Sequence, residues 1–249
     1  MNRPAAKRSW RSAREYGWAR PTAAAVLAVL FLSALAGVAT AQIAPSSTEA
    51  AAYRGLHAAA WHGDAVKIAR LAQATPAALE ARDAHGRTPL HVAAHARRPA
   101  TVRALLAAGA NPSALDNDRY DAVTIAAVAD DEPTLDALLA GGASPRLVTS
   151  RYDGTALIAA AHLGHDGVVR RLIAAGAPLD HVNNLHWTAL IEAVVLGDGG
   201  PRHQETVKAL LAAGADRHLK DREGRTALDL AKARGYAAMA RMLEGRAGR

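Results

Sequence analysis

The feature that most constrains this chain is internal repetition. The phrase TPLHVAA at 88–94 has five relatives, so that the six copies begin near residues 54, 88, 121, 155, 188 and 226, at spacings of 34, 33, 34, 33 and 38 residues. A second phrase recurs in step with the first, as LLAAGAN at 105–111, LLAGGAS at 138–144, LIAAGAP at 172–178 and LLAAGAD at 210–216. A period of this length is typical of units that cannot bury their apolar faces alone and are stable only when stacked.

Six phrases in register resemble the ankyrin repeat, over residues 50–244. The resemblance implies an all-α solenoid of about six helix–turn–helix units with β-turn tips. The residues agree with it, because the repeated alanines favour helix and allow close packing, and Gly109 and its equivalents stand where a helix ends. Two positions depart from the family pattern: Asp121 replaces the first threonine of unit three, and His186 stands where unit five usually has a turn glycine.

The first 41 residues read as an export signal followed by a short linker. A basic segment ends at Arg20, an uncharged apolar run follows, and Ala39-Thr40-Ala41 forms a small-residue cleavage site. Cleavage after Ala41 would start the mature chain at Gln42, whereas the uncharged stretch 21–44 is also just long enough to remain as a membrane anchor. Both alternatives place the body outside the cytoplasm, and the form of the leader favours a bacterial periplasm. Residues 42–49 are predicted to be a linker and residues 245–249 a polar tail.

The charge distribution argues against nucleic acid as a partner. The formal net charge is +7, but residues 1–41 carry six basic residues and one acidic residue. The remaining 208 residues hold 24 basic and 22 acidic side chains, so the body is nearly balanced. A surface that follows phosphates needs clustered positive charge, and the body has no such excess.

Enzyme and cofactor motifs are absent from the sequence. There is no G-x-S-x-G, no phosphate-binding P-loop and no H-E-x-x-H, and no cysteine that could serve as a nucleophile or metal ligand. His95 and His162 belong to one column two units apart, so they should lie roughly 20 Å from each other at the usual helix-packing distance. Zinc ligands must converge on one ion, so this pair cannot share a metal, and no cofactor is expected.

The candidate binding residues are mostly aromatic, arginine or histidine side chains at equivalent positions of different units. One column lies just before each repeated phrase, and in the resembled family it lies on turn tips that flank the concave groove. A second column lies near the end of each first helix. Exposed tryptophan, tyrosine and arginine carry much of the energy of protein interfaces, although these rings could instead seal the neighbouring turns, as we expect for Tyr53 and Tyr236. The candidate residues in these columns and turns are Trp61, His62, Arg87, His95, Tyr120, Tyr152, His162 and Trp187.

One insertion breaks the period. Residues 197–203, GDGGPRH, lengthen unit five to 38 residues. Insertions in solenoids form loops on one face, often the binding face, so Asp198, Arg202 and His203 are further candidates for partner contact. A tolerated variation in length is the other reading.

These observations predict a non-enzymatic protein-binding scaffold outside the cytoplasm, whose partner the sequence does not identify. The expected oligomeric state is a monomer, and membrane contact is expected only if the leader stays attached. The alternative is a periplasmic stress or metal-handling factor that binds an ion or small ligand through surface histidines and the 197–203 loop.

Overall fold

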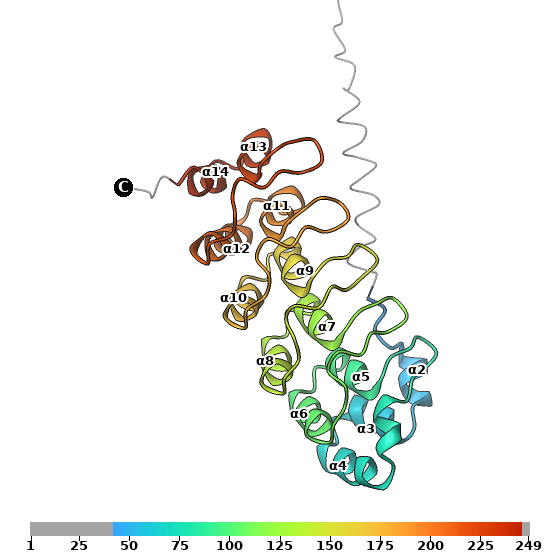
Figure 1. Ribbon diagram of the computed structural model, residues 1–249. Coiled ribbons are helices and arrows are strands. Elements are labelled where there is room, and N and C mark those ends of the chain that lie inside the picture. The colour runs from blue at the N-terminus through green and yellow to red at the C-terminus, as the bar shows by residue number, and fades with distance from the viewer. Residues whose placement is uncertain (1–41, 246–249) are drawn as a thin grey trace, which may run out of the picture. The chain divides into compact units, whose positions relative to one another are not determined.

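The computed structural model describes residues 42–245, so the leader and residues 246–249 of the tail lie outside the described part. The chain divides into two separate parts, residues 1–41 and residues 42–249. From Gln42 onward, two rows of short helices are joined by turns and loops (Figure 1). Within residues 42–245 there is no strand, only the isolated bridges Thr149–Gly154 and Lys220–Thr226.

The first row, which we call the inner helices, begins one residue after each predicted repeat start. The residue before each helix is its N-cap, and the side chains of Asp121, Thr155 and Thr188 accept a hydrogen bond from the backbone of the first turn. Asp121 therefore performs the role of the threonine that it replaces. The inner helices are α3 (Gly55–His62), α5 (Pro89–His95), α7 (Ala122–Val128), α9 (Ala156–Leu163), α11 (Ala189–Val195) and α13 (Ala227–Ala233).

The second row consists of the outer helices, one per unit. The glycines after these helices adopt the left-handed conformation predicted from the sequence, with φ of 95° at Gly109 and 94° at Gly214. A 3₁₀ turn, Pro76–Glu80, follows the first of them. The outer helices are α4 (Ala65–Ala74), α6 (Pro99–Ala107), α8 (Glu132–Ala140), α10 (Asp166–Ala174), α12 (Pro201–Ala212) and α14 (Ala237–Leu243).

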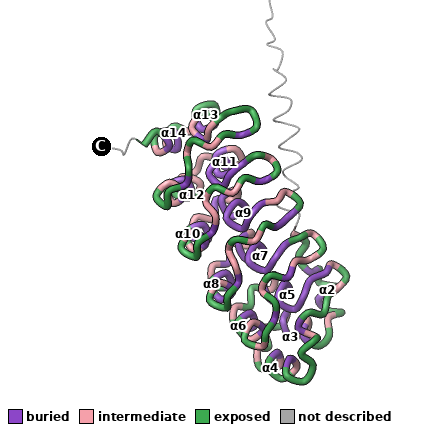
Figure 2. Tube along the Cα trace, viewed as in Figure 1, coloured by how far each residue is buried: buried purple, intermediate pink, exposed green. Residues whose placement is uncertain are grey.

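The core lies between the two rows and between successive units (Figure 2). The first leucine of each LL pair, such as Leu105 and Leu138, is fully buried, whereas the second, such as Leu106, is half-buried. The alanine at the seventh position of the repeated phrase, for example Ala94, is also fully buried, because its small side chain lets adjacent inner helices approach. Stacking thus buries what no single unit could bury.

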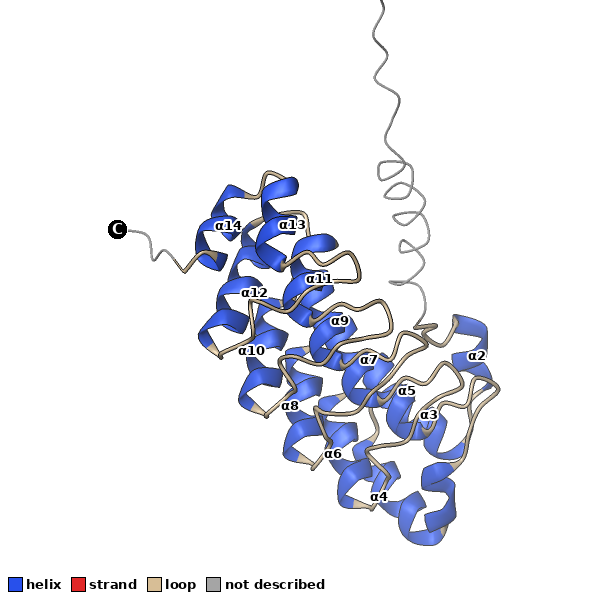
Figure 3. Ribbon diagram, turned by 45° about the horizontal axis from the view of Figure 1, so that its top comes forward, coloured by secondary structure: helices blue, strands red, loops and turns tan. Residues whose placement is uncertain are grey.

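A loop precedes each inner helix from α5 onward, and these loops project on one side of the stack (Figure 3). Most are held by an aspartate or asparagine five residues before the N-cap. The Oδ1 atom of Asp83 accepts from the backbone N–H groups of His85 and Arg87, both at 2.9 Å. Asp116, Asn183 and Asp221 repeat the arrangement, which satisfies backbone donors locally. His186 has φ of 64°, close to the 73° of Gly86 in the equivalent turn, so it accepts a conformation that glycine adopts more easily.

Side chains also join neighbouring units through backbone carbonyl groups. His91 Nδ1 accepts from the N–H of Thr88 at 3.1 Å, so its Nε2 carries the proton and donates to the carbonyl of Tyr120 at 3.0 Å. Near the end of the stack, the hydroxyl of Tyr236 donates to the carbonyl of Gly197 at 2.9 Å. Tyr236 therefore serves the fold, as the sequence predicted.

The two ends of the array are closed in different ways. Residues 42–49 are not a free linker, because helix α2 (Ser47–Ala52) begins within them with Ser46 and Glu49 forming a reciprocal capping box. At the other end, Lys232 occupies the seventh position of the phrase, where the other units have buried alanine or valine, and pairs with Glu244 at 2.8 Å. The last unit therefore presents a charged, exposed side chain where the inner units present a small buried one. None of the helices in the described part is long and apolar enough to cross a membrane.

Candidate protein-binding surface

The inner-helix column is the set of side chains at the last or next-to-last position of five successive inner helices. All five are half-buried, so each keeps part of its surface open to solvent. The set combines one tryptophan, two histidines and two valines, so it is largely apolar. Its members are Trp61, His95, Val128, His162 and Val195.

His95 contributes a neutral ring to this column. Burial lowers its pKa to about 4, and the positive charge of Arg87 acts in the same direction. At neutral pH the ring is therefore uncharged and can donate one hydrogen bond and accept another. His62, beside Trp61, is exposed at the end of α3.

His162 lies next to a carboxylate that the sequence analysis missed. Its Nδ1 is 3.4 Å from Oε2 of Glu192, whose other oxygen accepts a 2.8 Å hydrogen bond from Asn183. Glu192 is only 5% exposed, although the equivalent residues of the other units are apolar, such as Val92 and Ile125. The glutamate at a position that is apolar in the other units was the sequence signal that could have revealed this polar site. The trio gives the column one fixed polar point between α9 and α11.

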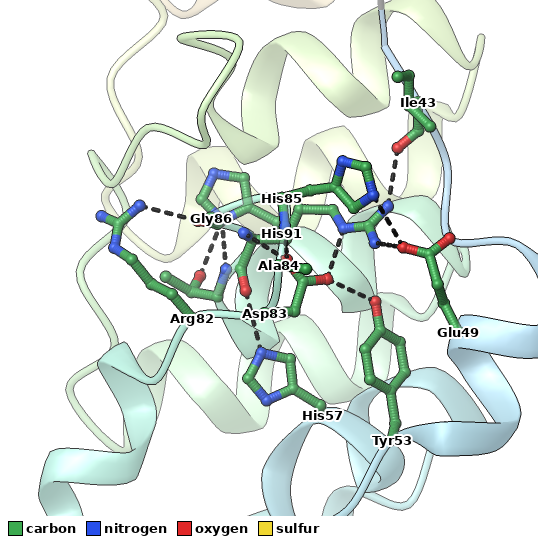
Figure 4. A network of polar contacts seen from close by, with 12 residues as sticks. Ile43, Glu49, Tyr53, His57, Arg82, Asp83, Ala84, His85, Gly86 and His91 are labelled. Carbon is green, nitrogen blue, oxygen red and sulfur yellow. Dashed lines mark hydrogen bonds and ion pairs between the residues drawn. The ribbon is translucent and has the colours of Figure 1, made fainter.

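Arg87 does not present its side chain to a partner, contrary to the sequence-based expectation. The guanidinium is 1% exposed and donates to Asp83 at 2.6 Å, to Glu49 at 2.6 Å and to the carbonyl of Ile43 at 2.9 Å. Tyr53 donates to the same carboxylate of Asp83 at 2.7 Å (Figure 4). The arginine thus fastens the N-terminal segment and α2 to the loop of unit two.

The charges of this network support one another. Hydrogen bonds from Ser46 and then the Arg87 guanidinium lower the pKa of Glu49 to about 2. Burial alone would favour the neutral acid at Asp83, but hydrogen bonds from Tyr53 and Arg87 hold its pKa below the usual range. Both carboxylates are therefore ionised around the buried cation at neutral pH.

Tyr120 and Trp187 are also buried, at 6% and 9% exposure, so the expectation that this column is exposed is wrong for them as well. Their backbone N–H groups donate to Oδ1 of Asp116 and of Asn183, at 2.8 and 3.0 Å. Tyr152 differs because its loop has one additional residue, and it remains half-exposed near the tip. Its carbonyl accepts a hydrogen bond from Asn184 in the next loop at 3.0 Å.

The 197–203 insertion is bound to the units before it. His203 Nε2 donates to the carbonyl of His162 at 2.9 Å, and its Nδ1 is 2.9 Å from Asp198. The guanidinium of Arg202 reaches Asp130 at 2.8 Å and Asp166 at 3.3 Å, two side chains of units three and four. Asp198 and Arg202 remain exposed, but the contacts of Arg202 and His203 join the insertion to units three and four.

Metal ligation is not favoured by these positions. Within residues 42–245, no group of three or more histidine or acidic side chains has a geometry that could hold a metal ion. Both ring nitrogens of His203 already make contacts in the fold. The candidate site is instead the inner-helix column, together with Tyr152 near the loop tips.

Comparison with known proteins identifies the repeat type and similar structures. A family model of three ankyrin repeats matches residues 123–221, and a single ankyrin repeat matches residues 85–117. The chain is similar to a solved ankyrin repeat domain from Acinetobacter baumannii AYE, with 40% identity and a TM-score of 0.71 over 76% of this chain and 96% of that chain.

Two further relatives extend the comparison. One is a chain in the complex of the predatory endopeptidase Bd0816 from Bdellovibrio bacteriovorus with the immunity protein Bd3460, at 26% identity and a TM-score of 0.62 over 78% of this chain and 99% of that chain. The other is the ankyrin repeat protein YahD of Escherichia coli K12, 41% identical over 85 residues, which are 34% of this chain and only 42% of that protein. Ankyrin repeats are generally non-enzymatic scaffolds for protein–protein interaction. The repeated phrases, the paired helices and these matches show that the chain belongs to the ankyrin-repeat family.

Proposed function

We propose that this protein is a scaffold that acts outside the cytoplasm and binds a partner protein through the inner-helix column, with Tyr152 as an additional contact. The observation that carries the proposal is the repetition of a half-exposed, mostly apolar position on five successive units. The column just before each repeated phrase offers less to a partner, because its side chains Arg87, Tyr120 and Trp187 are buried in the stack.

The chemistry of the column indicates what kind of surface it fits. Packed helices lie about 10 Å apart, so the column offers a contact at each such interval along the array. His95 is neutral and the valines are apolar. A partner with an apolar ridge would lose little hydration on this surface, and the tryptophan provides the large buried area typical of interface hot spots.

The structure of a similar chain also supports a protein as the binding partner. The relative in the complex of an endopeptidase with an immunity protein was solved as part of a protein–protein assembly. That similarity supports a protein as the ligand class and leaves the identity of this chain's partner to experiment.

The proposed location is supported by the leader sequence. The basic segment, apolar run and Ala39-Thr40-Ala41 site support export, with cleavage before Gln42 and the body in the periplasm. The alternative, an inner-membrane anchor formed by the same leader, places the body on the same side.

The test compares two triple variants of the exported chain in affinity capture from native periplasmic extract, with captured proteins quantified by mass spectrometry. The first carries Trp61→Ala, His95→Ala and His162→Ala. The control removes three side chains from outer helices, Arg70, Arg103 and Lys208. Both must unfold cooperatively. We expect the same protein to be captured by the unmodified chain and the control and to be lost from the first variant; equal capture by all three would refute the proposed surface.

A further inference from the structure

Gln42 occupies an unusual position in this chain. It directly follows the predicted cleavage site Ala39-Thr40-Ala41. This inference rests on the export that we propose above, because only cleavage after Ala41 gives Gln42 a free α-amino group.

We propose that Gln42 is a modification site, and that the mature protein begins with a pyroglutamyl residue. In this reaction the α-amino nitrogen of Gln42 attacks Cδ of its own side chain, and a C–N bond closes a five-membered lactam. The bond between Cδ and Nε2 breaks, and Nε2 leaves as ammonia with a proton from the attacking nitrogen. The balance needs no oxidant, reductant or second substrate. Because α-amino groups titrate close to pH 8, a reactive neutral fraction is present at neutral pH.

The first structural reason concerns the side chain that is lost. Nε2 of Gln42 is buried and has no hydrogen-bond partner. A buried donor without a partner is costly, since it gives up water and gains nothing. Cyclisation removes this group and leaves a compact ring with a single N–H.

The second reason concerns charge. The carbonyl of Ile43, the next residue, accepts a hydrogen bond from the buried guanidinium of Arg87 at 2.9 Å (Figure 4). A free ammonium at Gln42 would therefore be placed near an existing cation. Glu49, which pairs with the same guanidinium, already uses Oε1 for Arg87 and His85 and Oε2 for the N–H of Ser46. A neutral lactam fits this end of the chain better than a second positive charge.

The experiment expresses the full chain with its own leader in a Gram-negative bacterium and measures the intact mass of the protein purified from the periplasm. We expect a chain that begins at residue 42 and is lighter by one ammonia than the cleaved sequence. Edman sequencing should be blocked, and pyroglutamyl aminopeptidase should remove one residue and restore reading from Ile43.

The matched control is Gln42→Asn. Its amide is one methylene shorter, so closure would require a strained four-membered ring, and its mature form should keep a free amino terminus open to Edman sequencing. A wild-type chain that starts at Gln42 with its full mass and a free amine would overturn cyclisation alone. A chain that retains the leader, or is cleaved elsewhere, would overturn both the proposed processing and this inference, while the binding proposal would stand.

Discussion

Replacement of Arg87 by alanine tests how the array is closed at its N-terminal end. The side chain is 1% exposed and joins the loop of unit two to Glu49 and to the carbonyl of Ile43. His85 of the same loop makes a second contact with Glu49. Removal of the Arg87 side chain leaves the carboxylate of Glu49 without its cation. Asp83 keeps three donors, the hydroxyl of Tyr53 and two backbone N–H groups.

The magnitude follows from burial. Breaking a buried ion pair by removing one partner costs about 3–5 kcal/mol, and the donors left at Asp83 place Arg87→Ala near the lower end, about 3 kcal/mol. Arg225 provides the matched control, since it occupies the same column and pairs with Asp221 at 2.7 Å, but its side chain is 50% exposed. An exposed pair is worth at most about 1 kcal/mol, so Arg225→Ala should change stability little.

The assay is urea unfolding of both variants followed by circular dichroism, with hydrogen exchange of α2. We expect a loss of about 3 kcal/mol in Arg87→Ala, together with faster exchange in α2, because units of a solenoid depend on their neighbours. Equal losses in the two variants, or unchanged exchange in α2, would refute the role assigned to the buried arginine.

Three other predictions follow from the same contacts. Burial lowers the pKa of His91 to about 4, so its contribution to stability is complete above its ordinary pKa near 6.5 and is lost as the pH falls toward 4. Its full size is about 3 kcal/mol, and urea unfolding of His91→Gln at pH 7 and 4.5 should show a weaker pH dependence than the wild type; an identical dependence would contradict this. His203→Ala should cost about 1–2 kcal/mol in thermal unfolding through its lost hydrogen bond, and Gly164→Ala, whose added Cβ would lie 2.9 Å from the His203 ring, should cost less in that background than alone. Trp187→Ala should cost about 3 kcal/mol or more because the ring is buried, whereas Trp61→Ala should cost less; equal melting temperatures would show that the two rings are packed alike.

Much of the fold was predictable because repetition multiplies weak local signals. Every predicted repeat start is the N-cap of an inner helix, and the left-handed glycines follow the outer helices as expected. Units five and six keep the pattern on both sides of the insertion, since both bury most of the same apolar positions, with Glu192 and Lys232 as exceptions.

The surface was less predictable, because exposure depends on contacts between units that the sequence does not display. Arg87 and Arg225 are equivalent in sequence, yet only Arg87 is covered, by the N-terminal segment. The Ser46-x-x-Glu49 capping box could have revealed α2. The pairing of Arg202 with Asp130, 72 residues away, had no comparable local signal.

The central claim, that the inner-helix column is the partner-binding surface, is tested most directly by site-specific photo-crosslinking in living cells. A photoreactive phenylalanine would replace Val128 or Val195, which are half-exposed in the column, or Arg103 or Lys208, which are exposed on outer helices. The account predicts one crosslinked partner from both inner positions and none from the outer ones. Crosslinks formed only at the outer positions would contradict it.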